Sequence, residues 1–201
     1  MSVQRQPGQC AANAAPTAQP ILGQRSKPIQ PYGTVLNYPL ALSEEARKAS
    51  VDGLNQILAD SIYLRDMYKK GQWQVTGATF QQMHKLFGKH FKKQNMLVDK
   101  IGDRVQALGG VTVAVPHDVA AMTRIERPVI DREELPVQLS RLLEAHEVIL
   151  KECHELVKLA AAGGDDGTVE LVADHVVRPH ERAVWRLSAH LTDTPLVCAS
   201  K

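Results

Sequence analysis

One long, unbroken helical pattern runs through the middle of the chain, between residues 78 and 108. Apolar and aromatic residues recur there at steps of three and four, which is the period of one face of an α-helix. Gly77 comes before the pattern, and Gly109 with Gly110 stops it. The sequence therefore predicts one helix over about residues 78–108. Its repeating face consists of Phe80, His84, Phe87, Phe91, Gln94, Val98, Ile101, Val105 and Leu108.

Four residues of this helix, His84, Gly88, Asp99 and Asp103, point within a sector of roughly 100°. His84 and Asp99 are fifteen residues apart, which separates them by about 22 Å along the axis. One chain therefore cannot place both on the same ion. If the helix pairs antiparallel with its own copy, residue 84 faces the copy's residue 103 and residue 88 faces its residue 99, because each pair sums to 187. This register would build two equivalent sites per dimer, each from both chains.

The first 42 residues have a different composition from the rest of the chain. They are rich in Pro, Gln, Ala and Gly and contain no acidic residue. Arg5, Arg25 and Lys27 give the segment a charge of +3. Such a composition cannot form a core, so we expect a flexible basic tail over residues 1–42 and a folded domain over residues 43–197.

The folded domain is predicted to be all-α. Further apolar periodicity predicts long helices over about residues 43–70, 135–162 and 166–191, and Pro179 should kink the last of them. The long connection over residues 111–134 has room for a short helix at 117–122. Four long helices with one long crossover form the ferritin-like version of the four-helix bundle. The chain has no Glu-x-x-His pair of the kind that di-iron bundles use, so no iron site is expected inside the bundle.

Composition favours a cytoplasmic protein. The 201 residues carry a net charge of +2 and are 44% hydrophobic, which is enough for one domain with a substantial core. No apolar run reaches the ~18 residues of a membrane span, and no signal-peptide core is expected. The three cysteines, Cys10, Cys153 and Cys198, have no metal-ligand spacing and form no complete disulfide framework.

Several segments in the right order resemble the Dps family, the dodecameric mini-ferritins of starved bacteria. These segments are LNQILADSIYLRDMYKKGQWQVTG, FQQMHKLFGKHFKKQ, VDKIGDRVQALGG and LVADHVVRPHERAVWRLSAHL, and the resemblance covers about residues 34–197. It implies a hollow homododecamer in a bacterial cytoplasm that sequesters iron and protects against starvation and oxidative stress. In intact members, iron(II) is oxidised by hydrogen peroxide and stored as a ferric mineral. DNA binding by basic tails, and hence association with the nucleoid, is a further expectation.

The resemblance also implies a metal site, and this chain departs from it. Where the family has a histidine followed by tryptophan, this sequence reads Gln72-Trp73; the family's second histidine is His84. Gly88 replaces an acid. From the two-fold mate, the family supplies an aspartate, here Asp99, and a glutamate, here the shorter Asp103. The expected ligands are therefore His84, Asp99 and Asp103, with the weak ligand Gln72. Trp73, beside the site, would intercept a stray electron.

This ligand set predicts weakened ferroxidase chemistry, because two adjacent ions need several negative ligands. The alternative is a non-enzymatic shell that binds DNA or another divalent metal such as zinc. A helical scaffold with no metal role is a third reading.

Other charged and histidine positions have two interpretations. Asp165 and Asp166 either line an iron-entry pore, as the resemblance implies, or start the last helix. The tail residues Arg5, Arg25 and Lys27 either bind DNA or have no partner. We expect His175 and His180 to be ordinary surface residues, although histidine can ligate metal. We expect a solvated outer face at Lys89, His90, Lys92 and Lys93.

Overall fold

The structure is a computed structural model, and it describes residues 28–192. The proposed tail residues Arg5, Arg25 and Lys27 lie outside the described residues, as do Cys10 and Cys198. The unit that begins at Pro31 contains all the helices discussed below.

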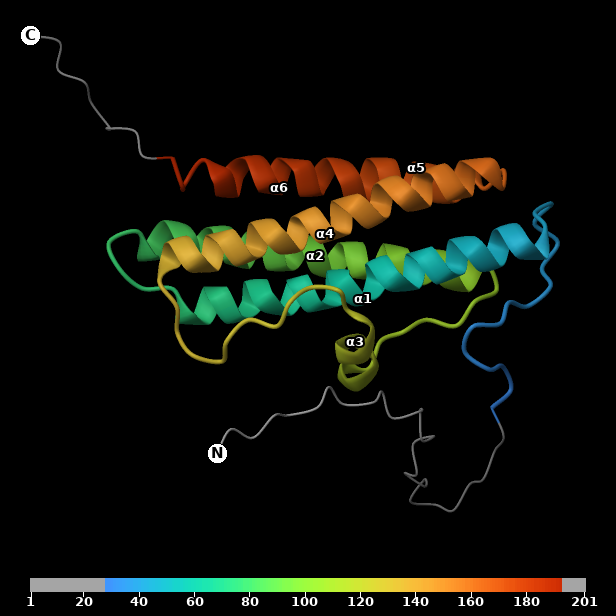
Figure 1. Cartoon of the computed structure of the whole chain (residues 1–201), viewed down its shortest axis with the longest axis horizontal. Helices are drawn as coiled ribbons and strands as arrows, with labels where there is room; N and C mark the ends of the chain where they lie inside the picture. The colour runs from blue at the N-terminus through green and yellow to red at the C-terminus, as the bar shows by residue number, and fades with distance from the viewer. Residues whose placement is uncertain (1–27, 193–201) are drawn as a thin grey trace, which may run out of the picture. The chain divides into compact units, whose positions relative to one another are not determined.

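Four long helical elements run side by side in this unit (Figure 1). The first two, α1 and α2, are joined by a short turn, and a long crossover then leads to the third and fourth. The chain order is α1 (Glu44–Gln74), α2 (Phe80–Ala107), α3 (Pro116–Met122), α4 (Leu135–Ala162), α5 (Asp166–Glu170), the π-helical segment η1 (Leu171–Val177) and α6 (Arg178–Ser188). The predicted all-α fold, with four long helices and a short helix in the crossover, is confirmed.

Local sequence explains where the helices begin and end. Ser43 caps α1, because its Oγ accepts a hydrogen bond from the backbone N–H of Ala46. Gly77 has a φ of 99° in the turn between α1 and α2, a conformation that favours glycine. Pro136 lies in the first turn of α4, and Gly163 follows its last residue. The predicted span of 135–162 therefore matches α4 at both ends.

The fourth helix is interrupted, as Pro179 predicted, but the interruption lies before the proline. Residues Leu171–Val177 form a π-helix, and Pro179 then lies in the first turn of α6. Proline has no N–H, and its ring collides with the carbonyl of the residue four positions earlier in a regular helix. A wider turn at this point gives that carbonyl room. The helix therefore continues in two α-helical pieces around η1.

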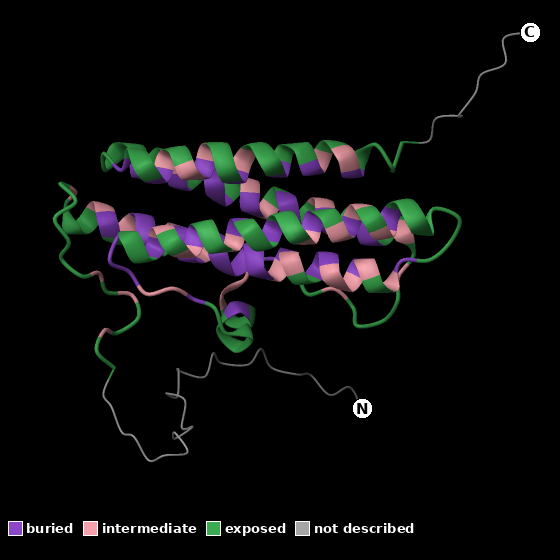
Figure 2. Cartoon of the chain, turned by 180° about the vertical axis from the view of Figure 1, so that it is seen from behind, coloured by how far each residue is buried: buried purple, intermediate pink, exposed green. Residues whose placement is uncertain are grey.

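The core lies along the facing sides of the helices (Figure 2). α1 packs against both α2 and α4, and α4 also packs against α6. Fully buried side chains at the centre include Leu54, Ile57, Leu64, Phe87, Ile101, Leu139, Ile149 and Leu187. Burying a side chain of this size contributes about 1.5–3 kcal/mol, so the interhelical contacts supply most of the driving force. Cys153 is also buried there as a free thiol, and burial raises its pKa to about 12.

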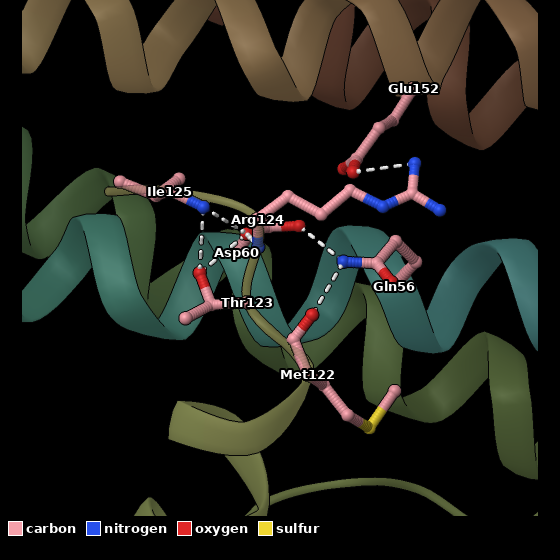
Figure 3. Close-up of polar contacts among 7 residues, drawn as sticks. All are labelled: Gln56, Asp60, Met122, Thr123, Arg124, Ile125 and Glu152. Atoms are coloured by element: carbon pink, nitrogen blue, oxygen red, sulfur yellow. Dashed lines mark hydrogen bonds and ion pairs between the residues drawn. The ribbon is translucent and has the colours of Figure 1, made fainter. Parts of the chain in front are cut away.

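A buried carboxylate on α1 holds the crossover in place (Figure 3). Asp60 accepts hydrogen bonds from the Thr123 hydroxyl at 2.6 Å and the Arg124 backbone N–H at 2.8 Å. It also accepts one from Gln56 at 2.7 Å, whose amide in turn donates to the Met122 carbonyl at 3.1 Å. The residues that follow α3 are therefore bound to α1 by polar contacts as well as by packing.

Glu152 on α4 lies beside this cluster (Figure 3). Its carboxyl is 7% exposed, and Arg124 approaches it to 3.4 Å. Burial is the main cause that raises the pKa of Glu152 to about 8, and the charge of Asp60 adds to it. The Arg124 guanidinium is 60% exposed, so water screens its charge and it offsets only part of this shift. Glu152 is therefore mainly protonated at neutral pH.

The last part of the expected tail contacts the folded unit. The Leu36 N–H donates to the Gly109 carbonyl at 2.8 Å, and the buried Arg47 side chain donates to the Leu36 carbonyl. Gly109 has a φ of 83°, and a Cβ on it would lie 2.7 Å from the Leu36 carbonyl oxygen. The expected boundary at residue 42 is therefore too late, because Leu36 and Asn37 accept hydrogen bonds from a buried guanidinium of the folded unit.

Candidate functional site

Two of the four expected metal ligands, Gln72 and His84, meet where α1 ends and α2 begins. His84 on α2 is half-buried, and its Nδ1 lies 3.0 Å from the backbone carbonyl of Gln72 on α1. The other ring nitrogen, Nε2, lies 3.5 Å from the side-chain nitrogen of Gln72. The structure therefore brings Gln72 and His84 together, as the sequence comparison implied. Since Nδ1 is engaged with a carbonyl, Nε2 is the nitrogen left to meet a metal.

The glutamine side chain fills the space beside Gly88. A Cβ placed on Gly88 would lie only 2.5 Å from Nε2 of Gln72. The two departures from the family pattern are thus physically linked, because the glutamine amide extends over the position from which residue 88 would project. An acid at position 88 would first have to displace this amide.

A lysine also occupies this neighbourhood. The Lys69 ammonium donates to Oε1 of Gln72 at 3.1 Å. The same ammonium lies 5.3 Å from the ring centroid of Trp73 and 4.7 Å from that of Phe91. The side-chain oxygen that Gln72 could offer a metal therefore already accepts a hydrogen bond, and a positive charge stands beside the site. Both features oppose the binding of a cation.

The other two expected ligands lie further along α2. Asp99 and Asp103 are exposed, and within residues 28–192 no group of three or more His, Cys, Asp or Glu side chains is arranged to hold a metal. The site from both chains of a dimer stays a prediction. Trp73, the expected electron acceptor, is 69% exposed next to Gln72.

Asp165 is buried within the chain, which contradicts a pore-lining role for this residue. Its carboxylate accepts from the backbone N–H of Thr168 at 3.1 Å and from its hydroxyl at 2.6 Å, and it is paired with Arg104. These hydrogen bonds lower its pKa despite the opposing effect of burial. Asp165, rather than Asp166, caps the helix. Asp166 is exposed, as are Glu170 and Asp174 one and two turns later, so the pore stays a prediction that would use these residues.

Three histidines and a tyrosine form a polar network in the core that the sequence analysis missed. The Tyr68 hydroxyl lies 3.0 Å from Nδ1 of His90 and 2.5 Å from Nε2 of His146. Nδ1 of His146 lies 3.0 Å from Nδ1 of His180, whose Nε2 is 3.1 Å from the amide nitrogen of Gln94. The network therefore crosses the bundle from α1 through α2 and α4 to α6.

Burial keeps these imidazoles neutral. His146 and His180 are each 1% exposed and His90 is 4% exposed. Burial is the largest cause that lowers the pKa of His90 to about 4 and that of His180 to about 3. The pKa of His146 lies well below its usual value for the same reason, and His180 lowers it further. The expectation that His90 and His180 lie on the surface is wrong, whereas His175 and the neighbouring lysines are exposed.

A sequence signal for the network exists. His90 follows Met83 and Phe87 and precedes Gln94 and Leu97, at steps of four and three. All five residues are buried. His146 and His180 occupy the same kind of position on α4 and α6. A histidine in step with the buried face of its own helix is therefore expected in the core, with a hydrogen-bonded partner.

Comparison with known proteins defines the class. Residues 51–197 match the family model of the ferritin-like domain. The solved structure of DpsC from Streptomyces coelicolor is 47% identical, covers 86% of this chain and 100% of its own, and superposes with a TM-score of 0.84.

Two curated relatives extend the comparison. The DNA protection during starvation protein of Halobacterium salinarum is 27% identical over 79% of this chain and 86% of its own length. The nutrient stress-induced DNA-binding protein of a Nostoc strain is 28% identical over 77% of this chain and 84% of its own length.

The fold and these matches define a ferritin-like protein. Within that class, the chain belongs to the Dps family.

Proposed function

We propose that the chain is the subunit of a Dps-type mini-ferritin, a hollow homododecamer that sequesters iron and protects a bacterial cell under starvation and oxidative stress. Family membership carries this proposal. The exposed carboxylates of Asp99 and Asp103 on α2 support it, because they are available to a second copy. In the antiparallel register, each site combines one imidazole and two carboxylates, a set that suits one divalent ion with water completing its shell.

The oxidation chemistry of such a site is expected to be slow or absent. Gln72 replaces an imidazole, its oxygen is taken by Lys69, and Gly88 offers no side chain. Two iron(II) ions side by side would repel each other with too few negative ligands to offset that repulsion. Iron is the substrate of this site, and retention of single ions is the behaviour that the donors favour.

Particle size and metal content test the proposal together. Light scattering should give about twelve chains per particle, as symmetric assembly of the family type requires. Anaerobic titration with iron(II) should then saturate near one ion per chain, and His84→Ala should remove that binding. A stable monomer of 22.1 kDa, or binding unaffected by His84→Ala, would contradict the proposal. Parallel titration with zinc separates iron sequestration from the alternative of a zinc-binding shell.

The second candidate function is a non-enzymatic shell that binds DNA through its N-terminal segments. The names of the Halobacterium and Nostoc relatives favour this candidate, as do the three cations of the segment before residue 28. Phosphate contacts make affinity fall steeply with salt. Deletion of residues 1–27 preserves the contact between Leu36 and Gly109 and should abolish salt-sensitive DNA binding without changing particle mass. Unchanged affinity after the deletion would exclude the tail as the DNA-binding element.

A further inference from the structure

A pocket of about 210 Å³ lies beside the histidine network. α2 lines one side of it, and η1 and α6 line the other. The buried residues Tyr68, His90, Gln94, His146 and His180 form its inner part. The cavity has space for roughly seven waters at the volume of liquid water. It is smaller than the pockets of about 300–1,000 Å³ that hold drug-sized ligands, so its occupant must be small.

The outer part of the pocket is cationic. Lys93 and Lys100 on α2 and Arg182 and Arg186 on α6 line it, and no acidic residue is among the described residues that do so. Within residues 28–192, none of the four forms an ion pair with a carboxylate. Lys100 instead approaches His175, at 3.3 Å. This arrangement repels metal cations and concentrates anions.

The positive potential is strong enough to act on the residues themselves. Burial lowers the pKa of Lys93, and the charges of Arg186, Lys89 and Arg182 lower it further. An anion placed among these groups would relieve their mutual repulsion. The described lining of the pocket thus carries four cations and no carboxylate.

The histidine network leaves one hydrogen-bond donor on His90, which lines the same pocket. With the Gln94 amide N–H donating to Nε2 of His180, that histidine must carry its proton on Nδ1 and donate it to His146. His146 then carries its proton on Nε2 and donates to the Tyr68 oxygen. The Tyr68 hydroxyl in turn donates to Nδ1 of His90. The orientation of the Gln94 amide therefore determines which atom donates in every hydrogen bond of the network.

This series of hydrogen bonds ends at His90, which keeps one N–H donor. Nδ1 of His90 accepts from Tyr68, so the neutral ring carries its proton on Nε2. Nε2 has no hydrogen-bond partner among the described residues, although the ring is 4% exposed and lines the pocket. A ligand or a water in the pocket can therefore accept a hydrogen bond from this N–H. We propose that this pocket binds a small oxyanion of the phosphate type, held by the four cations and by the Nε2–H of His90.

Calorimetry with inorganic phosphate on the intact full-length assembly tests this proposal. The wild-type protein should bind phosphate saturably, and Lys93→Gln with Arg186→Gln should weaken binding at least about tenfold, or 1.4 kcal/mol. The matched control is Lys92→Gln with Lys158→Gln, which removes two exposed charges that do not line the pocket and should leave affinity unchanged. Equal affinity in the variant and the control, or no saturable binding by the wild type, would overturn the proposal.

A second variant separates the pocket from a diffuse basic surface. His90→Leu keeps all four cations but removes the inner donor, and it should weaken phosphate binding several-fold while the assembly stays intact by light scattering. If affinity is unchanged, the bound ion does not reach His90 and the pocket assignment is wrong. Three further probes are then tested for their ability to displace bound phosphate. Displacement by a methyl phosphomonoester would show that the site accepts a phosphate group on a small molecule, whereas displacement by zinc or by duplex DNA would overturn the proposal.

Discussion

The helix α2 carries histidines into two different environments. His84 lies half-buried at the end of α1, has Gln72 as its only hydrogen-bond partner within residues 28–192, and retains a nitrogen for a ligand. His90, less than two turns later, is buried in a network that reaches His146 and His180. Family comparison identifies His84, and physical periodicity identifies His90. Hydrogen-bond partners, rather than residue type, therefore decide whether a histidine is part of the core or is available to a metal.

The largest expected effect is acid sensitivity of the buried network. In the folded state, the pKa values of His90, His146 and His180 lie below the usual value near 6.5. Their stabilisation is therefore fully present above pH 6.5 and is lost as the pH falls, because the unfolded chain then binds more protons. Each histidine should contribute a slope of about 1.4 kcal/mol per pH unit. Urea unfolding between pH 6.5 and 4.5 measures the combined slope.

A substitution within the network sharpens this result. His146→Leu should reduce the slope of the unfolding free energy against pH by the contribution of one histidine, about 1.4 kcal/mol per pH unit. His154→Gln, an exposed substitution on the same helix, should leave that slope unaltered. A wild-type protein whose stability is flat from pH 6.5 to 4.5 would show that the imidazoles are not held neutral.

The next effect compares the two kinds of histidine directly at neutral pH. His146→Leu leaves the Tyr68 hydroxyl and His180 without a shared partner, and an unsatisfied buried polar group costs about 1–3 kcal/mol. His84→Leu removes a half-buried ring and should change the unfolding free energy by about 0.5 kcal/mol. Equal losses of stability in the two variants would remove the distinction between the core network and His84.

A smaller effect of opposite sign is expected from Glu152. Its pKa is raised to about 8 in the folded chain, mainly by burial. The stabilisation is therefore present below the unfolded value near 4.5 and declines as the pH rises towards 8. Over pH 6.5 to 8, Glu152 should lower the unfolding free energy by about 1 kcal/mol per pH unit, whereas the partly protonated histidines of the unfolded chain add an opposite slope that fades by about pH 7.5. The difference between the wild-type and Glu152→Gln profiles isolates the carboxyl, and identical slopes in the two proteins would exclude Glu152 as a source.

Sequence alone predicted the helices well, because prolines and glycines at their ends start or stop a helix through their own backbone conformation. Pro136 and Gly163 bound α4, and Gly77 separates α1 from α2. The break in the last helix was expected from Pro179, but its form as a π-helix depends on how the bundle accommodates that proline. Leu36 was assigned to the tail, since its contact with Gly109 is not visible in composition.

The candidate site was only partly predictable. Family comparison placed His84 beside Gln72, and the structure brings them together. It did not reveal that the Gln72 amide occupies the space beside Gly88, or that Lys69 takes its oxygen. These facts depend on side-chain rotamers and on contacts between two helices. His90 and His180 were predicted on the surface because histidine is polar, although each lies three or four residues from buried neighbours on its own helix and so falls on the buried face.

We propose that Gln72 and Gly88 together suppress the oxidation of iron(II) beside His84. The direct measurement is the rate of iron(II) oxidation by hydrogen peroxide on the assembled protein. The unmodified protein should be slow, and Gln72→His with Gly88→Asp should raise the rate at least tenfold, or about 1.4 kcal/mol of barrier. Gly88→Asp alone should give less, because its Cβ meets the Gln72 amide. Rapid oxidation by the unmodified protein that survives His84→Ala would contradict the account.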